Sequence, residues 1–78
     1  MIVASIILRH PNASVGLDGM FIDTGPINAW LLENVGSNAP FRDSVDEERP
    51  WHTEHHFGYM VFNFARERDA TMFALRWA

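Results

Sequence analysis

The chain has 78 residues, enough for a single domain over residues 1–78 but too few for a large hydrophobic core. Its net charge is −4, with six arginines and no lysine, which argues against a general nucleic-acid-binding surface because such surfaces need cations to neutralise phosphates. It has no cysteine, which excludes a disulfide framework and favours a reducing compartment, the cytoplasm, or the host cytoplasm if the protein is viral.

The N-terminal segment predicts a buried β-strand. Residues 2–8 are rich in β-branched side chains and are apolar at both alternating sets of positions, as in a strand covered on both faces. The segment is too short to span a membrane and lacks the charged start of a signal peptide, and it ends before Pro11. The Asp18-Gly19 pair farther along favours a tight turn.

The strongest helix signal lies in residues 25–35. Thr24 is a suitable N-cap, Pro26 falls in the first turn, and Gly36 follows the last turn. Apolar residues occur at helical spacing between these signals, at Ile27, Trp30, Leu31 and Val35. We therefore expect a helix here.

Residues 37–50 form the most polar part of the chain. This composition predicts a loop with at most a short edge strand, anchored by Phe41 and Val45. A partner protein with a basic surface would complement the acidic residues of this loop. We therefore treat four of them as candidate partner-binding residues, namely Asp43, Asp46, Glu47 and Glu48.

A second long strand is predicted from about His55 to Phe64. Phe57, Tyr59 and Val61 would lie on one face of this strand, and the other face would also be apolar. A strand that is apolar on both faces belongs in the interior of a sheet.

Residues 66–76 predict a helix at the C-terminal end of the sequence. Ala70, Phe73 and Trp77 are spaced as on one helix face, and Trp77 is expected in the core. Residues 72–77 also alternate as in a strand. We favour the helix, because Ala, Met and Leu are strong helix formers.

Residues 51–56 hold the candidate metal ligands of the sequence. On a helix, the imidazoles of His52, His55 and His56 together with the Glu54 carboxylate would supply enough ligands for a transition metal. However, the segment runs into the predicted strand, where neighbouring histidines point to opposite faces. We therefore predict no bound metal and no cofactor, and expect the histidines to be solvated or hydrogen-bonded to the acidic loop.

No catalytic signature accompanies these histidines. The sequence contains no nucleophile elbow and no glycine-rich phosphate loop, and its acidic run has the composition of a solvated surface. We therefore expect a protein that is not an enzyme.

The sequence from Gly58 to Phe64 resembles the third strand of RNA-recognition-motif domains, and Asp69-Ala70 resembles the second helix that follows it. The expected order of elements also resembles the ferredoxin-like plan of those domains. The resemblance implies that Phe57 and Tyr59 form a base-stacking pair on the sheet. Val61 occupies the position of the family's second stacking aromatic residue.

The C-terminal pattern from Phe62 to Trp77 is similar to the end of many short proteins of tailed bacteriophages. This resemblance implies a class of protein and no activity. Members of the class are small, acidic, single-domain proteins that bind something larger, often a host enzyme, or serve as accessory parts of the virion.

Together these elements predict an α+β fold, a small ferredoxin-like sandwich with a three- or four-stranded sheet and two helices on one face. Residues 2–8 and 55–64 would be its central strands. The helices would leave the other sheet face bare, and an apolar face in so small a domain needs a cover. We therefore expect a homo-oligomer or a complex with a partner protein, and no association with nucleic acid or membrane.

The leading functional hypothesis is a non-enzymatic interaction protein, such as a phage-type modulator that covers the surface of a host or viral protein. The alternative is a single-stranded nucleic-acid binder of a degenerate recognition-motif kind, and the third hypothesis is a metal-dependent enzyme that uses the three histidines. Convergence of arginines on the face of Phe57 and Tyr59 would favour nucleic acid. The arginines concerned are Arg9, Arg66, Arg68 and Arg76.

Overall fold

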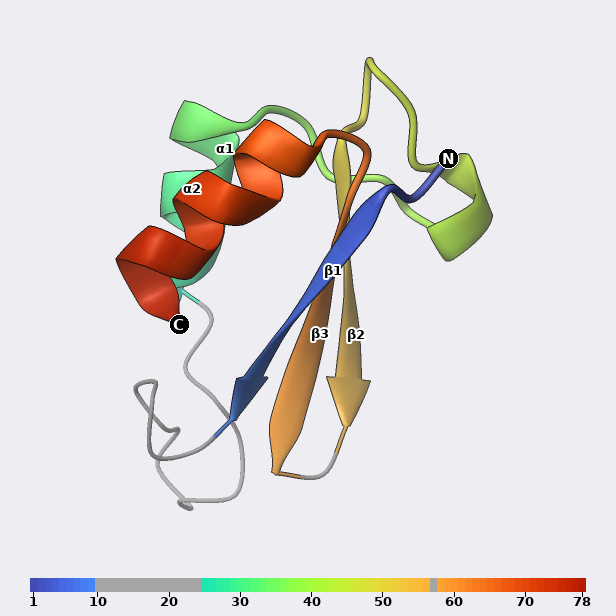
Figure 1. The fold of residues 1–78 in the computed structure, drawn as a ribbon. Coiled ribbons are helices and arrows are strands. Elements are labelled where there is room, and N and C mark those ends of the chain that lie inside the picture. The colour runs from blue at the N-terminus through green and yellow to red at the C-terminus, as the bar shows by residue number, and fades with distance from the viewer. Residues whose placement is uncertain (10–24, 57) are drawn as a thin grey trace.

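The computed structural model describes residues 1–9, 25–56 and 58–78 (Figure 1). Three strands, β1 (Ala4–Arg9), β2 (Trp51–His56) and β3 (Tyr59–Phe64), form an antiparallel sheet in the order β1-β3-β2. Two helices, α1 (Gly25–Asn34) and α2 (Glu67–Trp77), lie on one face of this sheet. The small α+β fold with two helices on one sheet face is therefore confirmed.

The predicted strand from His55 to Phe64 is wrong as a single element. β2 and β3 form a hairpin in which His56 pairs directly with Tyr59. Gly58 lies between them with a φ angle of 83°, a backbone conformation that glycine adopts without the steric cost that a Cβ atom brings. The chain therefore reverses at a point where the apolar alternation of the sequence continues.

β3 is the central strand of the sheet, and β1 lies at its edge. The prediction that residues 2–8 form a central strand is therefore wrong. Leu8 is buried against the helices, whereas Ile7, its neighbour on the opposite face, is 48% exposed. β1 is covered on one face only, although its sequence is apolar on both.

The core lies between the helices and the sheet, around the side chain of Phe73 from α2. The ring centroid of Phe73 lies 4.6 Å from that of Phe62 and 5.4 Å from that of Phe64, both in β3. Trp30 of α1 approaches the same ring edge-on at 6.1 Å. Other buried members of the core are Leu8, Ile27, Leu31, Val35, Trp51, Met60 and Ala70.

The helix predicted for residues 66–76 is confirmed, and residues 72–77 belong to it rather than to a strand. Trp77, expected in the core, is only partly buried at its margin. At the start of α2, the Arg66 side chain donates hydrogen bonds to the buried carboxylate of Asp69 (2.6 Å) and to the carbonyl of Val35 (3.2 Å). These bonds tie the first turn of α2 to the segment that follows α1.

The predicted loop between residues 37 and 50 contains one 3-10 turn, η1 (Arg42–Ser44), and a single bridge between Asn38 and Trp51. The expected tight turn near Asp18-Gly19 lies outside the described residues. Among the residues that the structure describes, no helix is long and apolar enough to cross a membrane.

We expect Phe73→Ala to lower the free energy of unfolding by about 3–5 kcal/mol, because the substitution leaves a cavity where both helices meet β3. A loss of this size approaches the whole stability of a small domain, roughly 5 kcal/mol. Urea unfolding measures the change. The control is Leu75→Ala, two residues away in α2, whose side chain is 85% exposed and should contribute less than about 0.5 kcal/mol. Equal losses in the two variants would contradict this account of the core.

Candidate functional site

The sheet face that points away from α1 and α2 is the first candidate binding surface, and we call it the open face. It carries the side chains of alternate residues in each strand, because successive strand residues point to opposite faces. These residues are Ser5, Ile7 and Arg9 of β1, Tyr59, Val61 and Asn63 of β3, and His52, Glu54 and His56 of β2.

A hydrogen-bonded network crosses the open face near the end of β3. The Ser5 hydroxyl donates to Asn63 Oδ1 at 2.6 Å, and Asn63 Nδ2 donates to Glu54 Oε2 at 2.8 Å. The Arg42 guanidinium donates to the same Glu54 oxygen at 3.3 Å. Because Asn63 is fully buried and its amide has partners on both sides, this network holds the three strands in register.

The middle of the open face is apolar. Ile7 and Val3, which precedes β1, are 48% and 56% exposed, and Val61 of β3, opposite Ile7, is half-buried. Ile7 and Val61 therefore form a short apolar strip in the middle of the face, and Ser5 of the polar network separates this strip from Val3.

Tyr59, a predicted binding residue, lies at the far end of the open face between two neighbours. The His56 ring stacks on it with centroids 4.7 Å apart and planes 8° from parallel, and the Arg9 guanidinium lies 5.7 Å from its ring centroid. Sequence reasoning named Arg9 as one of four arginines that could converge on the face of Tyr59, but it did not name His56, because the stack depends on strand register. Phe57, its predicted stacking partner, lies outside the described residues.

The three candidate metal ligands do not converge. His52 and His56 belong to the open face, whereas His55 points to the helix side of β2. His52 Nδ1 lies 3.0 Å from the carbonyl of Ala39. No group of three or more histidine, cysteine or acidic side chains in the described part of the chain is placed to hold a metal ion.

The four acidic candidates lie in η1 and the turn after it, where all are exposed. Asp46 Oδ1 accepts the backbone N–H groups of Arg49 and Glu48, both at 2.9 Å, and the bond from Arg49 is the main cause that lowers the pKa of Asp46. Glu47 lies 3.7 Å from the Arg66 guanidinium. Figure 1 shows this loop at the end of the sheet opposite the β2–β3 turn. The acidic loop and Tyr59 therefore do not form one site.

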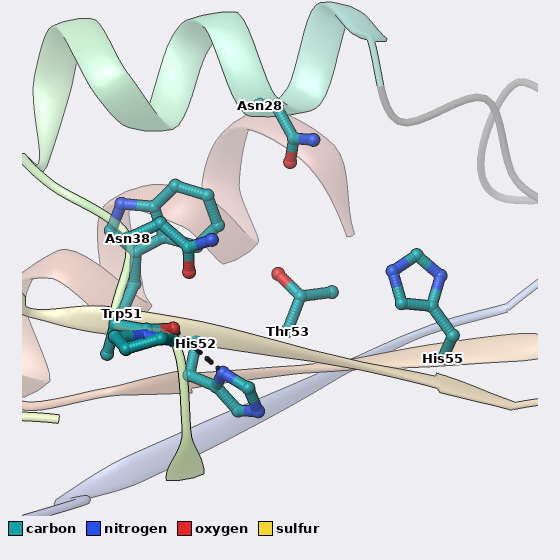
Figure 2. A pocket seen from close by; sticks show the side chains of 8 residues that line it. Asn28, Asn38, Trp51, His52, Thr53 and His55 are labelled. Atoms are coloured by element: carbon teal, nitrogen blue, oxygen red, sulfur yellow. Dashed lines mark hydrogen bonds between the residues drawn. The ribbon is translucent and has the colours of Figure 1, made fainter. Parts of the chain in front are cut away.

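A pocket of about 260 Å³ lies between α1 and the outer edge of β2 (Figure 2). Asn28 projects into it from α1, and Thr53 and His55 project toward it from β2. Thr53 Oγ1 is buried without a hydrogen-bond partner in the described structure. Sequence reasoning missed this pocket because its lining comes from a helix and a strand that the sequence does not place side by side.

We expect the free energy of unfolding of the wild-type chain to fall more between about pH 6 and about pH 3 than that of Glu54→Gln. The hydrogen bond from Asn63 is the main cause that holds the pKa of Glu54 below its ordinary value of 4.5. A carboxyl with a lowered folded-state pKa stabilises the fold above its unfolded pKa, and this contribution is lost as pH falls through the folded value.

Urea unfolding at the two pH values measures this difference. Glu33→Gln on the exposed side of α1 is the matched control and should follow the wild type, since Glu33 has no ion pair or side-chain hydrogen bond among the described residues. Parallel pH profiles for wild type and Glu54→Gln would show that the Asn63 hydrogen bond does not stabilise the fold.

Comparison with protein-family models finds no match to this chain. Comparisons with curated proteins and with solved structures find no significant match either.

Proposed function

We propose that the chain is a small non-enzymatic interaction protein that binds a larger protein through the open face of its sheet. The observation that carries this proposal is the one-sided cover of the sheet. Ile7 and Val3 stand exposed on the face that α1 and α2 leave uncovered. Exposed apolar surface on a sheet face, here Ile7 beside the half-buried Val61, marks interaction sites in soluble proteins.

The surroundings of the apolar strip support the same proposal. The network around Asn63 borders it at one end, and the stack of Tyr59 with Arg9 and His56 borders it at the other. An apolar centre with a polar rim is the usual composition of a protein interface, and tyrosine and arginine are enriched among the residues that contribute most to affinity.

The placement of the arginines favours a protein partner over nucleic acid. Arg66 and Arg68 lie at the start of α2 beside the Asp69 carboxylate, and the Arg76 guanidinium lies 4.2 Å from the ring of Trp77. α2 covers the opposite face of the sheet, so these cations do not join Arg9 beside Tyr59. The exposed acidic loop adds negative charge to the domain, which suits a partner with a basic surface.

A host or viral protein is the kind of partner suggested by the resemblance to small phage proteins. A second copy of the chain is the other protein that would cover the open face. Sedimentation velocity of the purified chain at tens of micromolar distinguishes the two: a monomer favours a different protein, and a dimer that Ile7→Glu dissociates favours self-association.

The stack of Tyr59 with Arg9 and His56 supports one alternative, single-stranded nucleic-acid binding. Aromatic rings on an uncovered sheet, with an arginine beside them, are a sequence-tolerant platform for bases. Binding of single-stranded RNA that weakens with salt and is lost in Tyr59→Ala, in a chain that stays monomeric, would replace the protein-binding proposal with this one.

We expect Ile7→Glu to weaken partner binding by about tenfold or more, because it places a carboxylate in the apolar strip where the partner would remove it from water. The measurement is capture of proteins from a host lysate on the immobilised chain, followed by titration of the captured protein. Leu32→Glu is the control: Leu32 is 60% exposed on α1, away from the open face, and this variant should bind as the wild type does. Equal binding by the two variants would place the interface elsewhere.

A further inference from the structure

We propose that the outer edge of β2 binds an extended peptide, which adds a strand to the sheet and places one uncharged, hydrogen-bonding side chain in the pocket under α1. Most of this site lies on the helix side of β2, and among its described lining residues His52 alone belongs to the open face. This is therefore a second binding site, and it does not depend on the function proposed above.

The backbone of β2 alternates between its two sides. On the inner side, the carbonyl of Pro50 accepts the N–H of Ala65 at 2.9 Å. On the outer side, the carbonyl of Trp51 accepts the N–H of Ala39 at 2.7 Å. In an antiparallel ladder, consecutive residues direct their N–H and C=O groups to opposite sides.

This alternation turns the N–H and C=O groups of Thr53 and His55 outward, as it does those of Trp51. No described segment pairs with β2 beyond Trp51 on that side. Two consecutive outward-facing residues therefore offer two donors and two acceptors to an added strand, which is the main-chain pattern that strand addition uses.

The chain itself shows that this edge accepts a strand. Asn38 forms a parallel bridge with Trp51, and Ala39 donates the hydrogen bond described above. After Pro40 the chain turns into η1 and does not continue along β2. The carbonyl of Ala39 lies 3.0 Å from the ring nitrogen of His52, so it already has a partner. The intramolecular strand thus ends just before Thr53, where the free edge begins.

The pocket beside this edge indicates which side chain the peptide presents. Thr53 Oγ1 is buried without a partner, and the Asn28 amide faces it across the pocket (Figure 2). A hydroxyl and an amide can each donate and accept hydrogen bonds. Among the described residues, the lining holds the imidazoles of His52 and His55 but no Asp, Glu, Lys or Arg, so a charged side chain would lose hydration without a permanent opposite charge to compensate. Ser, Thr, Asn and Gln fit this chemistry.

The size of the pocket agrees with a single side chain. Its volume of about 260 Å³ is below the roughly 300–1,000 Å³ that encloses a drug-sized ligand or cofactor. Affinity would therefore come mainly from main-chain pairing along Thr53 and His55, and the pocket would select the residue that faces Thr53.

The test uses a displayed library of linear nine-residue peptides, selected against the full-length chain and synthesised for titration. We expect the selected peptides to share Ser, Thr, Asn or Gln at one position. In ¹⁵N-labelled protein, the amide signals of Thr53 and His55 should shift on titration and exchange more slowly with solvent. The signals of Tyr59 and Val61 on the open face report binding at the other site.

Two substitutions at His55 distinguish the contribution of its backbone N–H from that of its side chain. His55→Pro removes the outward N–H and leaves the β2–β3 ladder intact, so it should weaken peptide binding about tenfold or more. His55→Ala keeps the N–H and should weaken binding less than about threefold. Thr53→Val keeps the backbone and shape but removes the hydroxyl, and should weaken binding about threefold to tenfold.

The proposal is overturned if no peptide is enriched over a selection against His55→Pro, or if the Pro and Ala variants bind equally. Signal shifts confined to Tyr59 and Val61 would also overturn it, and would leave the open face as the peptide site. Loss of lysate capture in Ile7→Glu, with peptide binding retained, would show that the two sites are independent.

Discussion

The contact of Phe73 with β3 is the interaction on which the rest of the structure depends. Its ring meets Phe62 and Phe64 of the central strand and Trp30 of α1, so one side chain joins both helices to the sheet. A domain of this size buries few other large side chains. Because α1 and α2 both pack on this side, neither of them covers the opposite face of the sheet, and β1 remains half-covered.

Both helices and the strand character of β1 and β3 could be predicted from the sequence, because end signals and apolar spacing act locally. The hairpin could not. Apolar alternation runs across Gly58, and only the backbone conformation of that glycine shows that the chain reverses there. β2 could not be predicted for a different reason. Trp51 is its one large apolar residue, so its strand conformation depends on pairing with β3 and not on the local preference of its residues for strands.

The binding surfaces were less accessible to sequence reasoning than the fold. Alternation along β3 placed Tyr59 opposite the buried residues, and the structure agrees. The proximity of His56 and Arg9 to Tyr59 depends on the register of three strands, which no single segment specifies. The pocket depends on packing still more, since Asn28 and Thr53 meet only when α1 lies over the edge of β2. The acidic loop is exposed as its composition indicated, but at the opposite end of the sheet from Tyr59.

The pairing of β1 with β3 has a consequence for how the domain assembles. The β2–β3 hairpin joins neighbouring segments, so closing it costs little chain entropy. β1 must instead find its register against residues near the other end of the chain, with Ala4 opposite Phe64. During synthesis, β1 leaves the ribosome well before its partner strand exists. Its apolar side chains therefore stay exposed to other chains until the hairpin forms, which makes β1 the segment most open to misassociation during folding.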